Sequence, residues 1–250
     1  MRRLRTTGVL VAAGLLAAAC SSSSSSGTGG GNASASKVVT ISNENGALWT
    51  CGFNPLLGSD QLLAFGFVYE PLVYVNPLQN GKTTPMLATS WTWGAGNNSL
   101  TFTIRNGVKW NDGTPMTAAD VVYTFNLMKK YPALDLPGVW SVLSSVTQSG
   151  DQVTMKFKAP AVPDFYYIAD QTPIMPQHVW SKISNPVTYA NPHPVGTGPY
   201  KVNPCTSQNV TYTANPNYWQ PGLPKITKVE YPAFTSNNTA NDQLANGQAQ

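Results

Sequence analysis

The chain has 250 residues, of which 42% are hydrophobic and 10% are charged, and its formal net charge is +4 at pH 7. Three arginines precede residue 20, and without them the net charge falls to +1. The remaining chain therefore lacks the basic excess that is typical of nucleic-acid-binding proteins. The length beyond residue 36 is enough for one large domain or two small ones.

The first 19 residues have the pattern of a targeting segment. The basic start is followed by an unbroken apolar and small-residue run over 8–19 and then by Cys20. At about 1.5 Å per helical residue, this run is too short to cross a hydrocarbon layer of about 30 Å. The order resembles a lipoprotein signal peptide, which predicts removal of 1–19 and lipidation of Cys20. An ordinary signal peptide that ends beside a cysteine is the alternative.

A tether is predicted directly after this segment. Residues 21–26 are all serine, and residues 27–36 add only small or polar side chains. Such a stretch cannot bury a core and behaves as a flexible linker. We therefore expect residues 20–36 to be a lipidated cysteine followed by a Ser/Gly tether.

The chain contains three cysteines. With Cys20 assigned to the lipid, Cys51 and Cys205 remain as an even pair in an exported chain, where thiols oxidise. We predict a disulfide between them, with two free thiols as the alternative. Two cysteines without a neighbouring histidine do not indicate a metal site, and we expect no metal and no cofactor.

The first elements after the tether follow from side-chain periodicity. Residues 37–42 are short and β-branched and predict a strand. Residues 61–69 are rich in Leu and Phe and predict a buried helix that ends at Pro71. Residues 72–75 predict a short strand. Residues 99–105 alternate between apolar and polar side chains, which is typical of a half-buried strand.

The clearest helix is predicted to begin after Thr117. The Thr117 hydroxyl can cap the first turn, and Asp120 stands three residues later, as in a capping box. Val121 and Phe125 belong to an apolar stripe at helical spacing, and the helix is expected to end at the two lysines before Pro132.

The rest of the chain continues the mixture of strands and helices. Five further strands are predicted, over 142–146, 152–157, 200–202, 210–213 and 226–231. Residues 241–250 predict a helix that stops in mid-pattern without a C-terminal cap, as if the chain were cut. The pattern as a whole indicates an α/β or α+β domain without internal repeats.

Four segments together resemble a known family. They are TFTIRNGVKWNDGTPMTAADVV (101–122), PVGTGPY (194–200), NPNYW (215–219) and LANG (244–247). In this order they are similar to the signature of the bacterial extracellular solute-binding proteins, family 5, the oligopeptide, dipeptide and nickel group. Each segment alone is common, but the ordered set is specific and spans about residues 38–250.

The resemblance implies an α/β, periplasmic-binding-protein-like fold of type II, in the peptide-binding cluster, with two lobes around a ligand. Residues 37–60 and 176–250 would form the discontinuous core of the first lobe. Residues 61–175 would form an inserted subdomain of that lobe. Most of the second lobe would lie beyond the end of the chain.

The resemblance also implies a function. The protein would be a monomeric lipoprotein on the outer face of the cytoplasmic membrane, capture a peptide or peptide-like ligand, and deliver it to the permease subunits of an ABC importer. It would not be an enzyme, and no G-x-S-x-G, H-E-x-x-H or C-x-x-C motif is present. The alternatives are a nickel-chelate, sugar or other small-solute cargo, or a peptide-sensing or scaffold lipoprotein without transport.

Candidate ligand contacts lie mainly in the loop after the first predicted strand. In peptide binders of this family, that loop offers backbone groups to the ligand, and Glu44 can also pair with a ligand amine. The competing interpretation is a simple strand-end turn. The candidates are Asn43, Glu44, Asn45, Gly46, Leu48, Trp49 and, from a later loop, Trp140.

The other motif residues are expected to be structural. Four glycines should supply backbone angles that other residues resist: Gly107, Gly113, Gly196 and Gly198. Three aromatic residues should belong to the core: Trp110, Tyr218 and Trp219. Four polar residues should serve in turns, caps or surface loops: Asp112, Asp120, His178 and His193.

Overall fold

The computed structural model describes residues 37–41, 47–234 and 236–249. The chain divides into two units, Met1–Ala35 and Ser36–Gln250, and the elements below all belong to the second. The predicted signal peptide, Cys20 and tether lie outside the described residues, as do Asn43, Glu44, Asn45 and Gly46. Within the described part of the chain, no helix has both the length and the apolar character needed to cross a bilayer.

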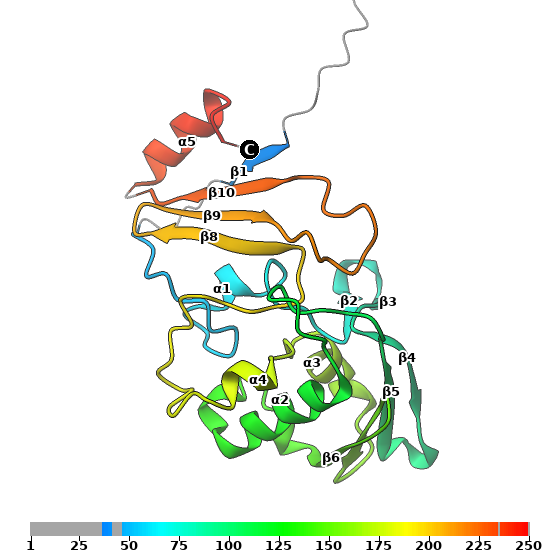
Figure 1. Cartoon of the computed structure of the whole chain (residues 1–250). Helices are drawn as coiled ribbons and strands as arrows, with labels where there is room; N and C mark the ends of the chain where they lie inside the picture. Colours follow the sequence, from blue (N-terminus) through cyan, green and yellow to red (C-terminus); the bar gives the residue numbers. More distant parts are fainter. Residues whose placement is uncertain (1–36, 42–46, 235, 250) are drawn as a thin grey trace, which may run out of the picture. The chain divides into compact units, whose positions relative to one another are not determined.

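The first sheet joins the two ends of the unit. Its four strands lie in the order β1 (Val38–Thr40), β10 (Lys228–Pro232), β9 (Asn209–Ala214) and β8 (Tyr200–Thr206) (Figure 1). β1 runs parallel to β10, and the other neighbours are antiparallel. The strands predicted near residues 38, 200, 210 and 228 are thereby confirmed and form one sheet.

The second sheet comes entirely from the middle of the chain. Its strands lie in the order β4 (Ala88–Trp93), β5 (Ser99–Ile104), β7 (Gln152–Phe157) and β6 (Leu143–Ser149). The hairpin of β2 (Val73–Asn76) and β3 (Lys82–Pro85) precedes it. The alternation predicted for β5 is confirmed, since Leu100, Phe102 and Ile104 are buried. The proposed boundaries of the inserted subdomain remain a prediction.

Short helices connect these strands. They are α1 (Gln61–Ala64), η1 (Pro77–Gln79), η2 (Ala95–Asn97), η3 (Pro132–Leu134), η4 (Val139–Ser141), η5 (Val162–Asp164), α3 (Phe165–Ala169) and α4 (Gln177–Trp180). Two helices are longer, α2 (Ala118–Lys130) and α5 (Asn237–Ala245).

The predicted helix over 61–69 is wrong beyond Ala64. Gly66 has φ of 82°, which a right-handed helix does not allow, and the chain closes a turn in which Phe65 bridges Tyr69. Leu62, expected to be buried, is 57% exposed. The apolar residues fit a helix by spacing, but they are buried by a turn that packs under the first sheet.

The C-terminal helix also differs from its prediction. α5 begins at Asn237, where the Ser236 hydroxyl accepts a hydrogen bond from the Thr239 amide, and it ends at Ala245. Gly247 has φ of 69°, and the Gln248 amide turns back to the Gln243 carbonyl. The helix therefore has a glycine C-terminal cap, and the expectation of an uncapped helix is wrong.

Two of the four motif glycines have the predicted role and two do not. Gly107 and Gly113 have φ of 81° and 91°. Gly196 and Gly198 do not have positive φ; instead, a Cβ at either position would overlap the backbone of residues 67–68. The Gly198 amide donates to the Val68 carbonyl at 2.8 Å. These two glycines are needed for close backbone approach.

The N-terminus of α2 has the predicted capping box. The Asp120 carboxylate accepts a hydrogen bond from the Thr117 amide at 2.8 Å, and the Thr117 side chain accepts one from the Asp120 amide. The other Asp120 oxygen accepts the Gln177 amide at 2.9 Å, which joins α2 to the start of α4. Asp120 is 6% exposed, so these bonds are shielded from water.

We expect Asp120→Ala to lower the free energy of unfolding by about 2–4 kcal/mol, because it removes a helix cap and leaves the Gln177 amide without its acceptor. Urea unfolding measures the loss. Asp120→Asn keeps one acceptor oxygen and should fall between the wild type and the alanine variant. A loss for Asp120→Ala no larger than that for Asp151→Ala, on an exposed turn, would contradict this role.

Candidate functional site

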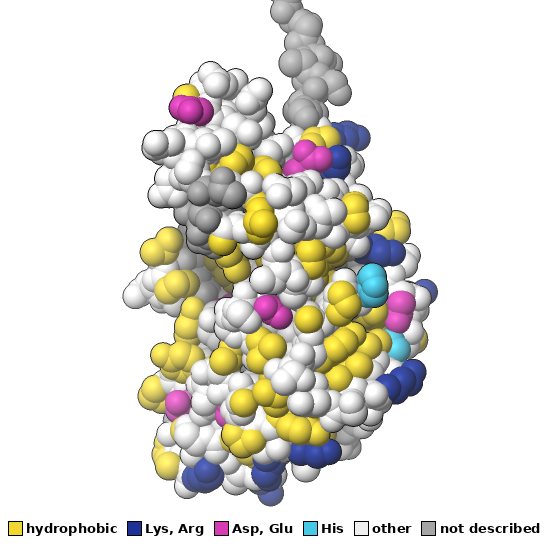
Figure 2. Space-filling model, turned by 90° about the vertical axis from the view of Figure 1, so that its left-hand side faces the viewer, with side chains coloured by type: hydrophobic (Ala, Val, Ile, Leu, Met, Phe, Trp, Pro, Cys, Tyr) yellow, Lys and Arg dark blue, Asp and Glu magenta, His cyan; other side chains and the backbone are white. Residues whose placement is uncertain are grey.

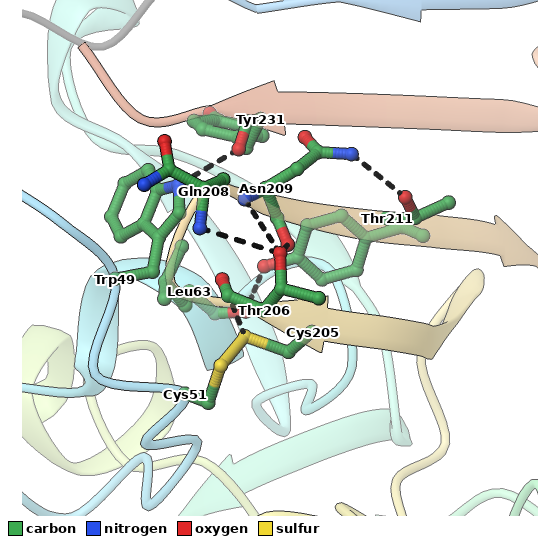
Figure 3. Close-up of a disulfide and its surroundings, with 10 residues drawn as sticks. Trp49, Cys51, Leu63, Cys205, Thr206, Gln208, Asn209, Thr211 and Tyr231 are labelled. Carbon is green, nitrogen blue, oxygen red and sulfur yellow. Dashed lines mark hydrogen bonds between the residues drawn. A yellow bond between two sulfur atoms is a disulfide. The ribbon is translucent and has the colours of Figure 1, made fainter.

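A disulfide fixes the segment that follows β1. Cys51 and Cys205 are bonded, with their Cα atoms 5.8 Å apart and 154 positions apart in sequence (Figure 3). The predicted disulfide is confirmed. It ties the chain just after residues 47–50 to the far end of β8, next to the turn into β9.

Trp49 provides a second anchor for the same segment. Its backbone amide donates to the Ser207 carbonyl at 2.9 Å. Its indole Nε1 donates to the Tyr231 carbonyl at 2.8 Å (Figure 3). Its ring meets the Tyr231 ring edge to face at 6.1 Å. Before residues 42–46, the Ile41 amide donates to the Glu230 carbonyl at 2.8 Å. Ile41 and Trp49 are therefore both held against β10.

The aromatic residues beside Trp49 form a packed cluster next to this anchor. Phe67 stacks on Tyr212 with ring centroids 4.8 Å apart, and its edge contact with Tyr231 measures 5.8 Å. The Tyr212 hydroxyl donates to the Leu63 carbonyl at 2.7 Å, and Tyr212 is fully buried. Trp49 thus packs at the rim of a cluster that joins the first sheet to α1.

The described candidate ligand contacts differ in exposure and in location. Leu48 is 48% exposed and Trp49 is partly buried. Trp140 lies elsewhere, where its indole Nε1 donates to the Phe125 carbonyl at 2.7 Å and the Lys129 ammonium lies 4.4 Å from its ring. Trp140 is therefore built into the packing on α2. Its role as a ligand contact stays a prediction.

A buried carboxylate was not anticipated from the sequence. Glu70 is 2% exposed and accepts hydrogen bonds from the Tyr218 hydroxyl at 2.7 Å and from the Trp219 indole at 2.9 Å. Burial raises the pKa of Glu70 to about 6, although both hydrogen bonds lower it. Tyr218 and Trp219, expected as core aromatics, are only partly buried and hold this carboxylate. A single acidic residue in the apolar run before Pro71 was the available signal.

Glu70 should make stability depend on pH. Its pKa of about 6 in the folded chain exceeds the ordinary value of 4.5, so the folded state takes up this proton first as the pH falls. The free energy of unfolding should therefore increase by about 2 kcal/mol from this group between pH 7 and pH 4.5. The Glu70→Gln variant cannot take up this proton, so its free energy of unfolding should lack this increase. Urea unfolding of both proteins at the two pH values tests this, and a constant difference between them would contradict it.

Asp112 has the predicted turn role and one further contact. Its carboxylate accepts the Thr114 amide at 2.9 Å, and its other oxygen lies 2.7 Å from His178 Nε2. Burial raises the pKa of Asp112, but the bonds with His178 and Thr114 outweigh it and leave the pKa below its usual value.

Trp110, predicted to be core, is fully buried. Among the described residues, no group of three His, Cys, Asp or Glu could hold a metal ion.

The family follows from a match over most of the chain. Residues 82–250 match the model of the bacterial extracellular solute-binding proteins, family 5, middle region. The chain belongs to this family. Its members bind solutes, so the expectation that the chain is not an enzyme is confirmed.

Several proteins are similar to this chain in both sequence and fold. A Brucella ovis protein, whose name assigns it to peptide binding in an ABC transporter, is 30% identical over 206 residues, which are 79% of this chain and 38% of that protein. The periplasmic oligopeptide-binding protein of Thermotoga maritima, solved with mannohexaose, is 29% identical with a TM-score of 0.76, over 86% of this chain and 41% of that one.

A third comparison supports the same fold. AppA of Bacillus subtilis, an oligopeptide-binding protein solved with a nonapeptide, is 26% identical with a TM-score of 0.69, over 85% of this chain and 42% of that one. The predicted periplasmic-binding-protein-like α/β fold is confirmed. This chain spans about two fifths of the length of these relatives.

Proposed function

We propose that the protein containing this chain captures a peptide or peptide-like solute outside the cell and delivers it to an ABC importer. The observation that carries the proposal is the anchored loop, by which we mean residues 47–50, held by Trp49 against the end of β10. Ile41, directly after β1, is held against the same strand. β1 and β10 are parallel, and ligands of open α/β sheets bind beyond the carboxyl ends of such strands (Figure 2 views the molecule from this end). The names of the Brucella ovis and Bacillus subtilis relatives support peptide as the cargo.

In this proposal the ligand lies between two lobes that close around it by a hinge. The loop after β1 would offer main-chain groups to an extended ligand, as in recognition by strand addition. Glu44 would pair with a ligand amine, and Leu48 would cover the ligand. Because Trp49 is bonded to Tyr231, its part would be to hold the loop.

The location and anchoring of the protein are part of the same proposal. Family membership places it outside the cytoplasm. Removal of residues 1–19 and lipidation of Cys20 would fix it to the membrane through the tether over 20–36. A monomer on such a tether could reach the permease subunits of the importer.

A different cargo is the second candidate. The Thermotoga maritima relative is named for oligopeptides but was solved with mannohexaose, so peptide-binding names in this family do not exclude an oligosaccharide. Nickel chelates and other small solutes belong to the same alternative. A peptide-sensing lipoprotein would bind a signalling peptide without import, and a scaffold lipoprotein would hold an envelope partner instead.

A thermal-shift screen of the full-length, unlipidated protein tests the cargo. The probes are di- to octapeptides, oligosaccharides and nickel–histidine, because a ligand that binds only the folded state raises the melting temperature by mass action. Stabilisation by peptides is expected. Stabilisation by another class alone would overturn the peptide proposal and keep solute binding, and no response to any class would overturn both.

A further inference from the structure

A cavity of about 350 Å³ lies beside Glu70, away from the anchored loop. Its wall combines residues from the α1 turn, β2, the α3 segment and the turn after β9. The aromatic and acidic residues of the wall are Phe65, Glu70, Tyr74, Tyr166, Asp170 and Tyr218. The volume falls within the range of small-molecule sites, which are mostly apolar with a few convergent polar groups.

The cavity and the anchored loop lie at opposite ends of β8. Pro199, which lines the cavity, directly precedes β8, whereas Cys205 and its disulfide lie near the other end of the strand. Six residues of extended strand span about 20 Å. A ligand in the cavity would therefore not contact the loop that the proposed function uses.

The wall carries negative charge without a cation among its lining residues. Asp170 is 5% exposed, and its oxygens accept the Val75 amide at 2.8 Å and the Gln171 side chain at 2.6 Å. Glu70 likewise accepts hydrogen bonds from neutral donors, Tyr218 and Trp219. Burial raises the pKa of Asp170, because its charged form is poorly solvated there.

Among the described residues, Arg105 is the cation that lowers the pKa of Glu70, and its side chain is directed elsewhere. The Arg105 side chain donates through Nε to the Met86 carbonyl at 2.8 Å, and its guanidinium lies 4.3 Å from the centre of the Trp219 ring. Its electrostatic influence on Glu70 is smaller than that of burial or the hydrogen bonds. Two buried carboxylates therefore face the cavity with neutral donors as their direct partners.

Aromatic side chains complete the wall. Tyr74, which is 46% exposed at the rim, and the rings of Tyr166, Tyr218 and Phe65 line the same space. Aromatic faces attract cations and pack against apolar groups. We propose that this cavity binds a small free organic cation, a primary amine carried on an aromatic or aliphatic body.

The test compares two probes that differ only in the presence of a positively charged amine. Tyramine carries the amine, and 4-ethylphenol is its neutral counterpart of similar shape. Each is titrated into the full-length protein at neutral pH and followed by calorimetry. We expect tyramine to bind at one site at least about tenfold more tightly than 4-ethylphenol, because only tyramine pairs with the carboxylates.

Two substitutions test whether tyramine binds in the cavity. Asp170→Asn keeps an oxygen for the Val75 amide but loses the charge, and it should weaken tyramine by about tenfold or more. Tyr74→Ala removes an exposed part of the rim and should also weaken tyramine binding, while at 46% exposure it removes little buried packing. Asp151→Asn, on the exposed turn between β6 and β7, removes the same charge and should leave tyramine binding unchanged.

Three results would overturn the proposal. They are equal binding of the two probes, no saturable binding of tyramine, and equal binding of tyramine to the wild type, Asp170→Asn and Tyr74→Ala. Because the cavity is remote from the anchored loop, none of these results depends on whether peptides raise the melting temperature.

Discussion

Replacing Cys51 and Cys205 together with serine will lower the free energy of unfolding by about 2–5 kcal/mol. The disulfide closes a loop of 154 positions, and the chain-entropy model gives about 5 kcal/mol for such a loop, with typical losses of 2–4. The loss should also reach the anchored loop, since Cys51 follows Trp49 by two residues. Urea unfolding of the oxidised wild type and the double variant measures the effect.

Reduction of the wild type provides the matched control for this variant. Reduced wild type and the double serine variant should unfold at the same urea concentration, because both lack the cross-link but keep the same packing. Exchange of the Trp49 amide, which is bonded to the Ser207 carbonyl, should become faster in both. Equal stability of oxidised and reduced wild type would show that the disulfide does not support this part of the fold.

Gly196→Ala will lower the free energy of unfolding by about 3 kcal/mol or more, or prevent folding. The added methyl group would overlap the Val68 carbonyl, which is backbone and cannot rotate away. The turn over 194–200 would have to move away from residues 67–68, breaking the bond from the Gly198 amide to the Val68 carbonyl. Circular dichroism during urea unfolding gives the loss.

Gly58→Ala is the matched control for that substitution. A methyl group at Gly58 meets nothing within 4 Å, and its backbone has no positive φ. Its effect should stay within about 0.5 kcal/mol. If Gly196→Ala were as mild as Gly58→Ala, the close approach of the two segments would not be a constraint on the fold.

Local patterns predicted the elements whose side chains alternate or cap. Residues 99–105 alternate, and β5 buries every second residue. Thr117 and Asp120 stand at capping-box spacing, and α2 begins between them. The pairing of Cys51 with Cys205 followed from assigning Cys20 to the lipid, which leaves two cysteines in a chain expected to be exported. In each case the signal lies within a few residues or in the number of candidates.

Long-range contacts explain what the sequence did not predict. The segment over 65–69 has helical spacing, but Gly66 and the approach of Gly196 and Gly198 make it a turn. Glu70 is buried because Tyr218 and Trp219, about 150 positions later, cover it. A single sequence does not reveal which distant turn covers a carboxylate, so neither Glu70 nor the cavity beside it could be predicted.

The candidate ligand site remains a prediction, and the structure clarifies the part of one of its residues. Trp49 was named as a contact of the ligand. The structure shows that the Trp49 indole is engaged by Tyr231, so its chemistry serves to hold the loop. Only Leu48 among the described candidates presents a largely exposed side chain at that place.

Calorimetric titration of the full-length protein with a short peptide tests solute binding most directly. The expected result is saturable binding at one site per molecule, with a negative heat-capacity change because apolar surface is buried when the ligand is enclosed. Absence of saturable binding for peptides, oligosaccharides and nickel–histidine alike would contradict the proposal that this chain belongs to a protein that captures a solute.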